Sequence, residues 1–282
     1  MKSMLLLLLG SVSLVGLASD WKLVWSDEFD RPGQPDPKKW TYENGFVRNE
    51  ELQFYTVGRR ENARVENGCL VIEARREDWR NPKYQPKGRS WMQTREKALY
   101  TSASLTTENL ASWQYGRFEI RAQVTAGKGT WPAIWMLGTN INKVGWPACG
   151  ELDIMEFLGK DPLTIHGTIH YADPQKKGGH LSSGKSTKTT VPAANGFHLY
   201  AMEWNEKTIE LFCDGQKYHS FDLDQAGTGP DNPFRKPQYL LLNLALGGWG
   251  GPIDDQAMPQ RYLIDYVRVY AMKTPAATAK KP

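Results

Sequence analysis

Three carboxylates lie within six residues of an otherwise apolar stretch, GELDIMEFLG at 150–159. Because the side chains of a strand alternate between its two faces, Glu151 and Asp153 share one face and Glu156 points to the other. A β-bulge at Ile154-Met155 would add one residue to the strand and return Glu156 to the face of the first two acids. The alternative is an ordinary half-exposed strand whose acids face water.

Three acids on one face could divide the work of hydrolysis between them. A glycosidase that retains the anomeric configuration needs two carboxyl groups about 5–5.5 Å apart, one as nucleophile and one as acid/base. Mutual repulsion and an apolar setting raise the pKa of one carboxyl group, while hydrogen bonds keep the other ionised. The Cα atoms of Glu151 and Glu156 would be roughly 13 Å apart, so the long side chains must lean together over a curved sheet. Asp153, between them, can share a proton or a hydrogen bond with the nucleophile.

The elements that position these acids are predicted to be short strands. Alternation of apolar and polar residues over 118–124 is typical of a half-buried strand. The turns Asn67-Gly68 and Asp214-Gly215 each separate two apolar runs, which indicates two hairpins. The run YLLLNLAL at 239–246 is apolar enough for a strand buried on both faces. With no internal repeat and no long amphipathic helix, the pattern predicts an all-β sandwich of two antiparallel sheets.

The chain begins with MKSMLLLLLGSVSLVGLASDW, a lysine followed by a short apolar run and small residues. This pattern predicts a signal peptide over residues 1–18 and export to the extracellular space or periplasm. Gly and Ser interrupt the run, which is also short for a membrane anchor. Residues 19–272 are expected to form one catalytic domain, with long surface loops at 79–90 and 173–190. The tail 273–282 is expected to be disordered.

Composition excludes some classes of partner. The net charge is +4, and the basic residues are scattered, which argues against nucleic acid as a partner. The three cysteines form no CxxC pair and no disulfide framework, so we expect buried thiols. A single disulfide between two of them is the alternative. Eleven tryptophans suit either a core or a groove in which flat indoles stack on sugar rings. We expect a monomer with no membrane partner.

The segment WPACGELDIMEFLG resembles the active-site strand of glycoside hydrolase family sixteen, in the ExDxxE form of the laminarinases, which are endo-1,3-β-glucanases. The shorter ExDxE form is typical of the bacterial lichenases. The resemblance implies a β-jelly roll with a substrate cleft on its concave sheet, and endo-hydrolysis with retention through a covalent glycosyl-enzyme intermediate. It implies laminarin-type 1,3-β-glucan as substrate, with mixed-linkage 1,3-1,4 glucan as a further one. The other matching segments, in the family's order, are WSDEFD, NEELQFYT, YGRFEIRA, GKGTWPAIWMLG, FHLYAMEW, LGGWGG and IDYVRVY.

The same resemblance implies that Glu151 is the nucleophile, Asp153 its assisting carboxylate and Glu156 the general acid/base, with no cofactor for catalysis. His166 is an alternative to His170 on the neighbouring strand, and Glu51 is interpreted as a solvated loop charge. Arg75 and Trp249 are proposed from their chemistry, as a donor to sugar hydroxyls and an exposed indole in a Gly-rich loop, although Arg75 could equally be a surface charge. The candidate substrate-binding residues are Asn49, Arg75, Trp131, Trp135, Trp146, His170 and Trp249.

Many members of the family bind a structural calcium ion on the convex side. The matching positions here are Glu28, Gly68 and Asp265, in part through backbone oxygens, which are ligands that calcium prefers. An ordinary turn with two surface acids is the alternative. Two other functions stay open: a hydrolase of the same family acting on a galactan such as agar or carrageenan, and a non-catalytic β-glucan recognition protein. The presence of both Glu151 and Glu156 argues against the second.

Overall fold

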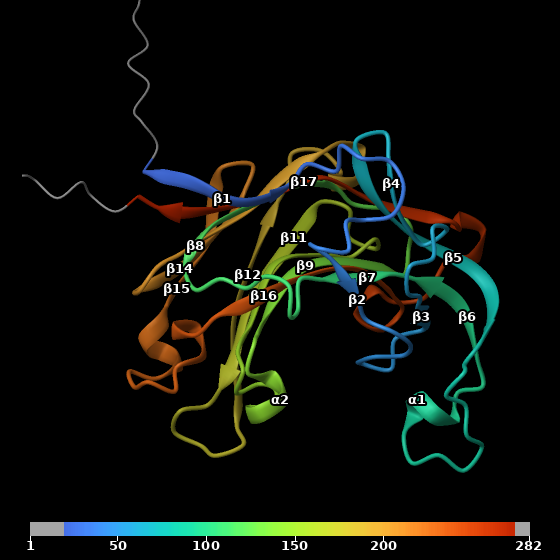
Figure 1. Cartoon of the computed structure of the whole chain (residues 1–282), viewed down its shortest axis with the longest axis horizontal. Helices are drawn as coiled ribbons and strands as arrows, with labels where there is room; N and C mark the ends of the chain where they lie inside the picture. Colours follow the sequence, from blue (N-terminus) through green and yellow to red (C-terminus); the bar gives the residue numbers. More distant parts are fainter. Residues whose placement is uncertain (1–19, 274–282) are drawn as a thin grey trace, which may run out of the picture.

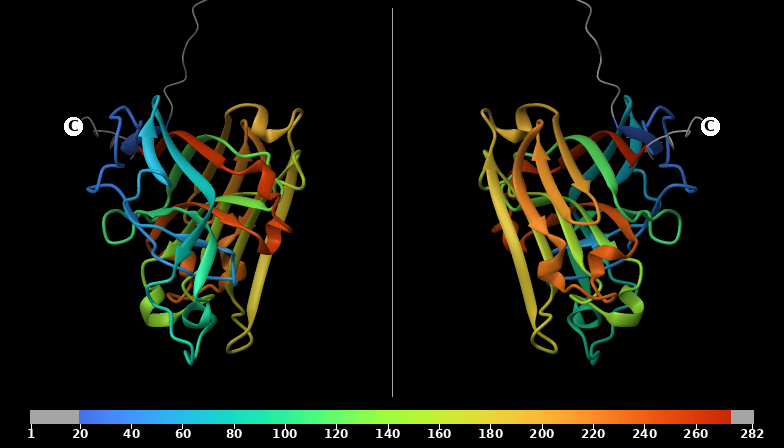
Figure 2. Two further views of the ribbon diagram at one scale, coloured as in Figure 1. Left: turned by 90° about the vertical axis from the view of Figure 1, so that its right-hand side faces the viewer. Right: turned by 90° about the vertical axis from the view of Figure 1, so that its left-hand side faces the viewer.

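A computed structural model describes residues 20–273. The predicted signal peptide and all but the first residue of the predicted tail lie outside the described residues. Two curved β-sheets pack face to face, as the two side views of Figure 2 and the front view of Figure 1 show. The predicted all-β jelly-roll sandwich is confirmed. The β3–β6 pair is parallel, and the other strand pairs of the described residues are antiparallel.

The seven-stranded sheet contains the strand with the three acids, which has two strands on one side and four on the other. Its neighbouring strands come from distant parts of the sequence, so that residues from 41 to 246 meet on one surface. In spatial order its strands are β12 (His180–Lys188), β11 (Thr164–Ala172), β10 (Glu151–Phe157), β9 (Thr130–Gly138), β16 (Gln238–Leu246), β7 (Ser104–Thr106) and β2 (Thr41–Tyr42).

The second sheet has ten strands and backs the first. Two of its strands lie off the main path, since β1 (Trp21–Asp27) pairs with β17 and β4 (Ala63–Glu66) pairs with β5. The others, in spatial order, are β15 (Gln216–Asp222), β14 (Thr208–Cys213), β13 (His198–Trp204), β8 (Gly116–Gln123), β17 (Gln260–Met272), β5 (Cys69–Arg80), β6 (Lys97–Ser102) and β3 (Gln53–Tyr55).

The core lies between the sheets and follows the expected alternation. In β8 the side chains of Phe118, Ile120 and Ala122 are buried, while the intervening residues face outward. All nine residues of β16 are buried, as the apolar run predicted. Both predicted hairpins form, at Asn67-Gly68 between β4 and β5 and at Asp214-Gly215 between β14 and β15.

The surface loop predicted at 173–190 is wrong over about half of its length. Residues 180–188 form β12, an edge strand of the seven-stranded sheet that pairs with β11 along its whole length. None of its nine residues is buried, so the strand has no apolar alternation for sequence analysis to detect. Polar residues on an edge strand also protect a sheet from pairing with other chains.

The helices of the described residues are short. The two α-helices, α1 (Trp91–Thr94) and α2 (Ile141–Val144), lie at the lower end of the molecule in Figure 1. No helix among the described residues has the length and apolar character needed to cross a membrane. The three cysteines all lie within the described residues as free thiols, with Cys149 and Cys213 buried.

Candidate active site

The three acids of β10 lie on one side of the sheet because of the predicted bulge. Against β11, Asp153 pairs with Thr168 and Glu156 pairs with His166, so three steps along β10 match two along its neighbour. The register against β9 shifts at the same place. All three carboxylates therefore line one cavity of about 510 Å³ on the seven-stranded sheet.

The bulge has a partner from the other sheet. The hydroxyl of Tyr218 donates a hydrogen bond to the backbone carbonyl of Ile154 at 3.0 Å. A side chain at Gly167 would collide with the Tyr218 hydroxyl, so the glycine gives the tyrosine access to the bulge. A bulge leaves backbone groups outside the ladder, and this contact satisfies one of them.

Glu156 has the environment of a general acid. Burial raises its pKa well above the usual range, and the nearby charges of Asp153 and Glu151 raise it further. The indole N–H of Trp131 donates to Oε1 of Glu156 at 3.0 Å and opposes the shift only in part. The side chain is therefore kept protonated into the pH range where ordinary glutamates are ionised.

Glu151 is surrounded by groups that favour its ionised form. Burial raises the pKa of Glu151, and the charge of His170, a hydrogen bond from Trp146, the charge of Arg48 and a hydrogen bond from Asp153 offset this rise in part. The indole N–H of Trp146 lies 2.9 Å from Oε2 of Glu151. The pKa of Glu156 is raised further, which is the order expected of an acid and a nucleophile.

Asp153 lies between the glutamates and is fully enclosed. Its pKa is raised well above the usual range by burial, and by the charge of Glu151 and a hydrogen bond to it. A protonated Asp153 can donate to an ionised Glu151, so the two groups share one negative charge. This arrangement suits the assisting role that the family resemblance implies for Asp153, which stays a prediction.

Aromatic side chains flank the acids. Trp131 and Trp249 meet edge to face, with ring centroids 5.7 Å apart, and Trp249 is 42% exposed. Trp146 is 49% exposed beside Glu151. Exposed indoles on both sides of a carboxylate cluster suit the faces of successive sugar rings. Trp131 and Trp146 line the cavity and Trp249 lies against Trp131, while their contact with sugar stays a prediction.

Trp135, a candidate substrate-binding residue, is covered by another side chain instead of being open to the cavity. It lines the cavity but is only 6% exposed, because the guanidinium of Arg48 covers its ring at 4.7 Å. Its indole N–H donates to Oδ1 of Asn243 at 2.7 Å. Asn49 also lines the cavity, at φ 54°, and donates to Glu51 at 3.3 Å.

Of the two candidate histidines, His170 is the one beside Glu151 and Asp153. Its Nε2 lies 3.3 Å from Oδ2 of Asp153 and 3.9 Å from Oε1 of Glu151. The ring of His166 instead packs against Trp249, with centroids 4.9 Å apart.

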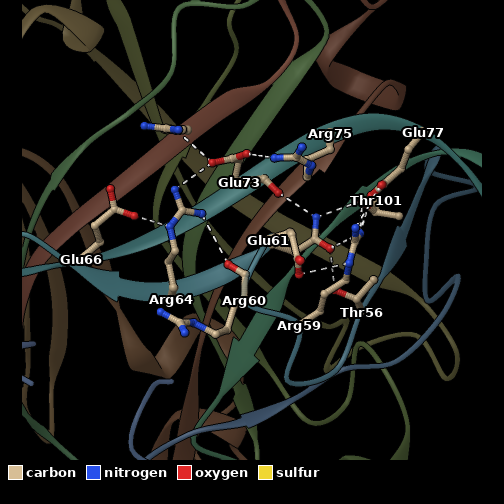
Figure 3. A network of polar contacts seen from close by, with 12 residues as sticks. Thr56, Arg59, Arg60, Glu61, Arg64, Glu66, Glu73, Arg75, Glu77 and Thr101 are labelled. Atoms are coloured by element: carbon tan, nitrogen blue, oxygen red, sulfur yellow. Dashed lines mark hydrogen bonds and ion pairs between the residues drawn. The ribbon is translucent and has the colours of Figure 1, made fainter. Parts of the chain in front are cut away.

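Arg75 does not line the cavity. It lies on the outer face of the ten-stranded sheet, where it forms an ion pair with the buried carboxylate of Glu73. Arg64 and Arg261 bind the same carboxylate, at 3.0 and 2.9 Å. Figure 3 shows Arg75 and Arg64 pointing at Glu73 from two strands. The structure therefore places Arg75 in a structural ion cluster rather than beside a sugar.

The interpretation of Glu51 as a solvated charge is wrong. Its side chain is 3% exposed, accepts a hydrogen bond from Gln53 at 2.7 Å and lines the cavity. Burial raises its pKa. Sequence analysis also missed Arg48, Glu43 and Asn243. Only Asn243 carried a signal, as the one polar residue inside the apolar run of β16.

The carboxylates predicted to hold calcium are both engaged by arginines. Glu28 pairs with Arg268 at 2.7 Å, and Asp265 pairs with Arg121 at 2.6 Å. As placed, these side chains do not fit a calcium site built from free carboxylates. A calcium ion held with backbone oxygens of Glu28 and Gly68 stays a prediction.

Comparisons with known proteins agree with the geometry of the cavity. Residues 50–268 match the family model described as Glycosyl hydrolases family 16. The chain belongs to this family. A beta-glucanase of Rhodothermus marinus is 45% identical to this family 16 hydrolase over 267 residues, covering 90% of this chain and 86% of the relative. The resemblance seen in the sequence is thus confirmed.

Two solved structures illustrate the range of the family. The catalytic domain of an endo-1,3-beta-glucanase (laminarinase) from Thermotoga petrophila RKU-1 is 44% identical to this family 16 chain, with a TM-score of 0.76 over 90% of this chain and 99% of that one. A structure from work on endo-acting O-glycanases with which human gut microbiota initiate mucin breakdown is 40% identical. Its TM-score is 0.85 over 91% of this chain and 93% of that one.

Proposed function

We propose that this family 16 hydrolase is an exported, retaining endo-β-glucanase that cleaves 1,3-β-D-glucosidic linkages of laminarin-type glucans. One observation carries the proposal: Glu151 and Glu156 line one cavity, on either side of Asp153, and the pKa of Glu156 is raised further than that of Glu151, whose rise His170, Trp146 and Arg48 partly offset. Mixed-linkage 1,3-1,4 glucan is proposed as a further substrate. The signal-like start of the sequence supports export.

The first chemical step uses both glutamates at once. The protonated carboxyl of Glu156 gives its proton to the glycosidic oxygen as the bond from that oxygen to the anomeric carbon breaks. The carboxylate of Glu151 attacks the anomeric carbon from the opposite face and forms a covalent glycosyl-enzyme. Trp146 and His170 stabilise Glu151 before attack, because both favour its anionic form.

The second step regenerates the enzyme. Glu156, now ionised, removes a proton from water, and the water oxygen attacks the anomeric carbon. The bond to Glu151 breaks, and its carboxylate returns to the shared hydrogen bond with Asp153. Two inversions give a product with the configuration of the substrate.

Glucan is the substrate proposed from the relatives. The relative from Rhodothermus marinus is a beta-glucanase, and the Thermotoga petrophila domain is a laminarinase. The cavity is lined by seven ionisable side chains, six of them carboxyl groups and one an arginine that pairs with Glu43. This excess of carboxyl groups suits an uncharged glycan better than a sulfated one.

A galactose-containing glycan is the second candidate. The O-glycanase structure has a TM-score of 0.85, higher than the 0.76 of the laminarinase domain, although its sequence identity is lower. The cover of Trp135 by Arg48 gives this cleft a polar platform in place of an open indole. Such a platform can select a different sugar while the catalytic acids keep their roles.

The proposal is tested by reducing-sugar release from laminarin, curdlan, barley mixed-linkage glucan, agarose, κ-carrageenan and mucin. We expect strong release from laminarin with a ladder of oligosaccharides. Release only from a galactose-containing polymer would overturn the glucan assignment and keep the catalytic acids. Binding without release from any polymer would overturn the enzymatic function.

A further inference from the structure

His180 links the candidate nucleophile to the surface of the protein. It is the first residue of the edge strand β12 and pairs with Ala172 of β11. Its Nε2 lies 2.9 Å from Nδ1 of His170. On its other side the ring packs against Trp146, with centroids 4.6 Å apart. The His180 side chain is thus fixed by two residues that themselves contact the catalytic acids.

The two imidazoles meet as hydrogen-bonded rings rather than as stacked ones. Their centroids are 5.1 Å apart and their planes differ by 24°. With a nitrogen–nitrogen distance of 2.9 Å, this is the geometry of an N–H···N bond in a nearly common plane. One of the two nitrogens therefore carries the proton and the other accepts it.

The other nitrogen of His170 faces the acids. Nε2 lies 3.3 Å from Oδ2 of Asp153, a buried oxygen with no hydrogen-bond partner among the described residues, and 3.9 Å from Glu151. A proton on Nε2 is favoured there, because both neighbours are carboxyl groups.

The surroundings of His180 favour the neutral form. Burial and the positive charge of His170 both lower the pKa of His180. Trp146, on the other side of the ring, brings no charge. The carboxyl groups of Glu151 and Asp153 lie beyond His170, which is the titratable group in contact with His180.

We propose that His180 is a positioning residue: the hydrogen bond between its Nε2 and Nδ1 of His170 holds His170 with its Nε2 toward Glu151 and Asp153. Held there, His170 favours the ionised form of Glu151, and the contact with Trp146 keeps His180 in place. No sequence signal marks this role, because residues 173–190 are predicted to form a polar surface loop. The proposal rests on the assignment of Glu151 as nucleophile.

The test compares His180→Phe with His180→Gln. Phenylalanine keeps an aromatic ring against Trp146 but cannot hydrogen-bond to His170, whereas the glutamine amide can still form a hydrogen bond with Nδ1 of His170. Lys185→Gln is the control, because Lys185 is an exposed residue of the same strand. The readout is kcat/KM from pH 4 to pH 9 on the polymer that the wild-type enzyme hydrolyses best, with the melting temperature of each variant.

We expect the acid limb of the His180→Phe profile to move to higher pH by about half a unit to one unit, since Glu151 loses part of its stabilising charge. This corresponds to a loss of about three- to tenfold in kcat/KM on that limb. His180→Gln and Lys185→Gln should keep the wild-type limb. An unmoved limb in His180→Phe, or the same shift in both His180 variants, would overturn the proposal. If Glu151→Gln kept wild-type activity, the proposed function itself would fail instead.

Discussion

The indole N–H of Trp146 lies 2.9 Å from Oε2 of Glu151, so a residue outside the catalytic strand holds the nucleophile. This hydrogen bond favours the ionised carboxylate and lowers its pKa against the effect of burial. Trp131 makes the equivalent contact with Glu156, at 3.0 Å. The two tryptophans thus bind the two glutamates as well as presenting surface to the sugar.

Replacement of Trp146 by phenylalanine should separate these roles. The phenyl ring keeps much of the apolar surface but donates no hydrogen bond, so the pKa of Glu151 rises. Because the nucleophile must be ionised, the acid limb of kcat/KM should move to higher pH. A hydrogen bond to a charged group contributes ~1.5–3 kcal/mol, which makes a loss of about tenfold or more reasonable at low pH. A Trp249→Phe variant is the comparison, since Trp249 packs against Trp131 and His166 rather than Glu151. This variant should weaken binding without moving the acid limb.

Azide rescue should assign the two glutamates. Loss of either catalytic group should lower activity by about 10²–10⁴-fold or more with the fold intact. In Glu156→Ala the glycosyl-enzyme still forms on an activated substrate, and azide should capture it as the β-glycosyl azide. In Glu151→Ala azide should replace the nucleophile and give the α-glycosyl azide. Products of the opposite configurations, identified by NMR, would exchange the two roles.

Asp153→Asn should make the protein more stable and less active. Burial and Glu151 raise the pKa of Asp153. A carboxyl group whose pKa is higher in the folded than in the unfolded state does not change the free energy of unfolding at pH values below its unfolded pKa. As the pH rises from the unfolded pKa toward the folded pKa, the group increasingly destabilises the folded state. The asparagine variant should therefore gain stability between pH 5 and pH 8 and none at pH 3. About 2–4 °C in melting temperature is expected for each kcal/mol gained. An equal change at both pH values would show that packing, not titration, is responsible.

The strand with the three acids could be predicted from sequence because the same residues indicate both its chemistry and its bulge. Acids at Glu151, Asp153 and Glu156 make sense on one face only if the strand has an extra residue, and the register shift lies there. The buried strand β16 was predictable for a related reason. The apolar run YLLLNLAL at 239–246 suits a strand buried on both faces, and all nine residues of β16 are buried.

The rest of the cleft depends on contacts that sequence spacing does not reveal. Glu51 appeared to be a loop charge, but Gln53 and Asn49 satisfy its carboxyl group in a buried position. Arg75 follows Glu73 by two residues on the same outward face, and that buried carboxylate binds it away from the cleft. His180 lies on an edge strand with no buried residue, so no periodicity marks it.

The predicted calcium ion is tested by removing and restoring it. If calcium binds through backbone oxygens of Glu28 and Gly68 and displaces Arg121 from Asp265, EDTA should lower the melting temperature and excess CaCl₂ should restore it. Activity measured below the melting temperature should not change, because none of the three residues lines the catalytic cavity. Asp265→Asn should lose the calcium response. A melting temperature that is the same with EDTA and with CaCl₂ would contradict the prediction.

Glu73 is expected to contribute more to stability than its distance from the cleft suggests. Its carboxylate is 1% exposed and binds Arg64 of β4, Arg75 of β5 and Arg261 of β17. Replacement of Glu73 by glutamine keeps the shape but leaves three guanidinium groups without the charge that brings them together. Loss of one partner from a buried ion pair costs ~3–5 kcal/mol, and the partial exposure of Arg75 and Arg261 places the expected cost at the lower end. Urea unfolding should show this loss.

Arg76→Gln is the matched control for Glu73→Gln. Arg76 lies on the same strand and pairs with Asp255, but both side chains are about half exposed. Exposed ion pairs contribute little to the free energy of unfolding, so this variant should unfold near the wild-type urea concentration. Both variants should keep the wild-type kcat/KM in the absence of urea, because Glu73 and Arg76 lie outside the catalytic cavity. Equal destabilisation by the two substitutions would show that the three-arginine cluster has no special weight in holding β4, β5 and β17 together.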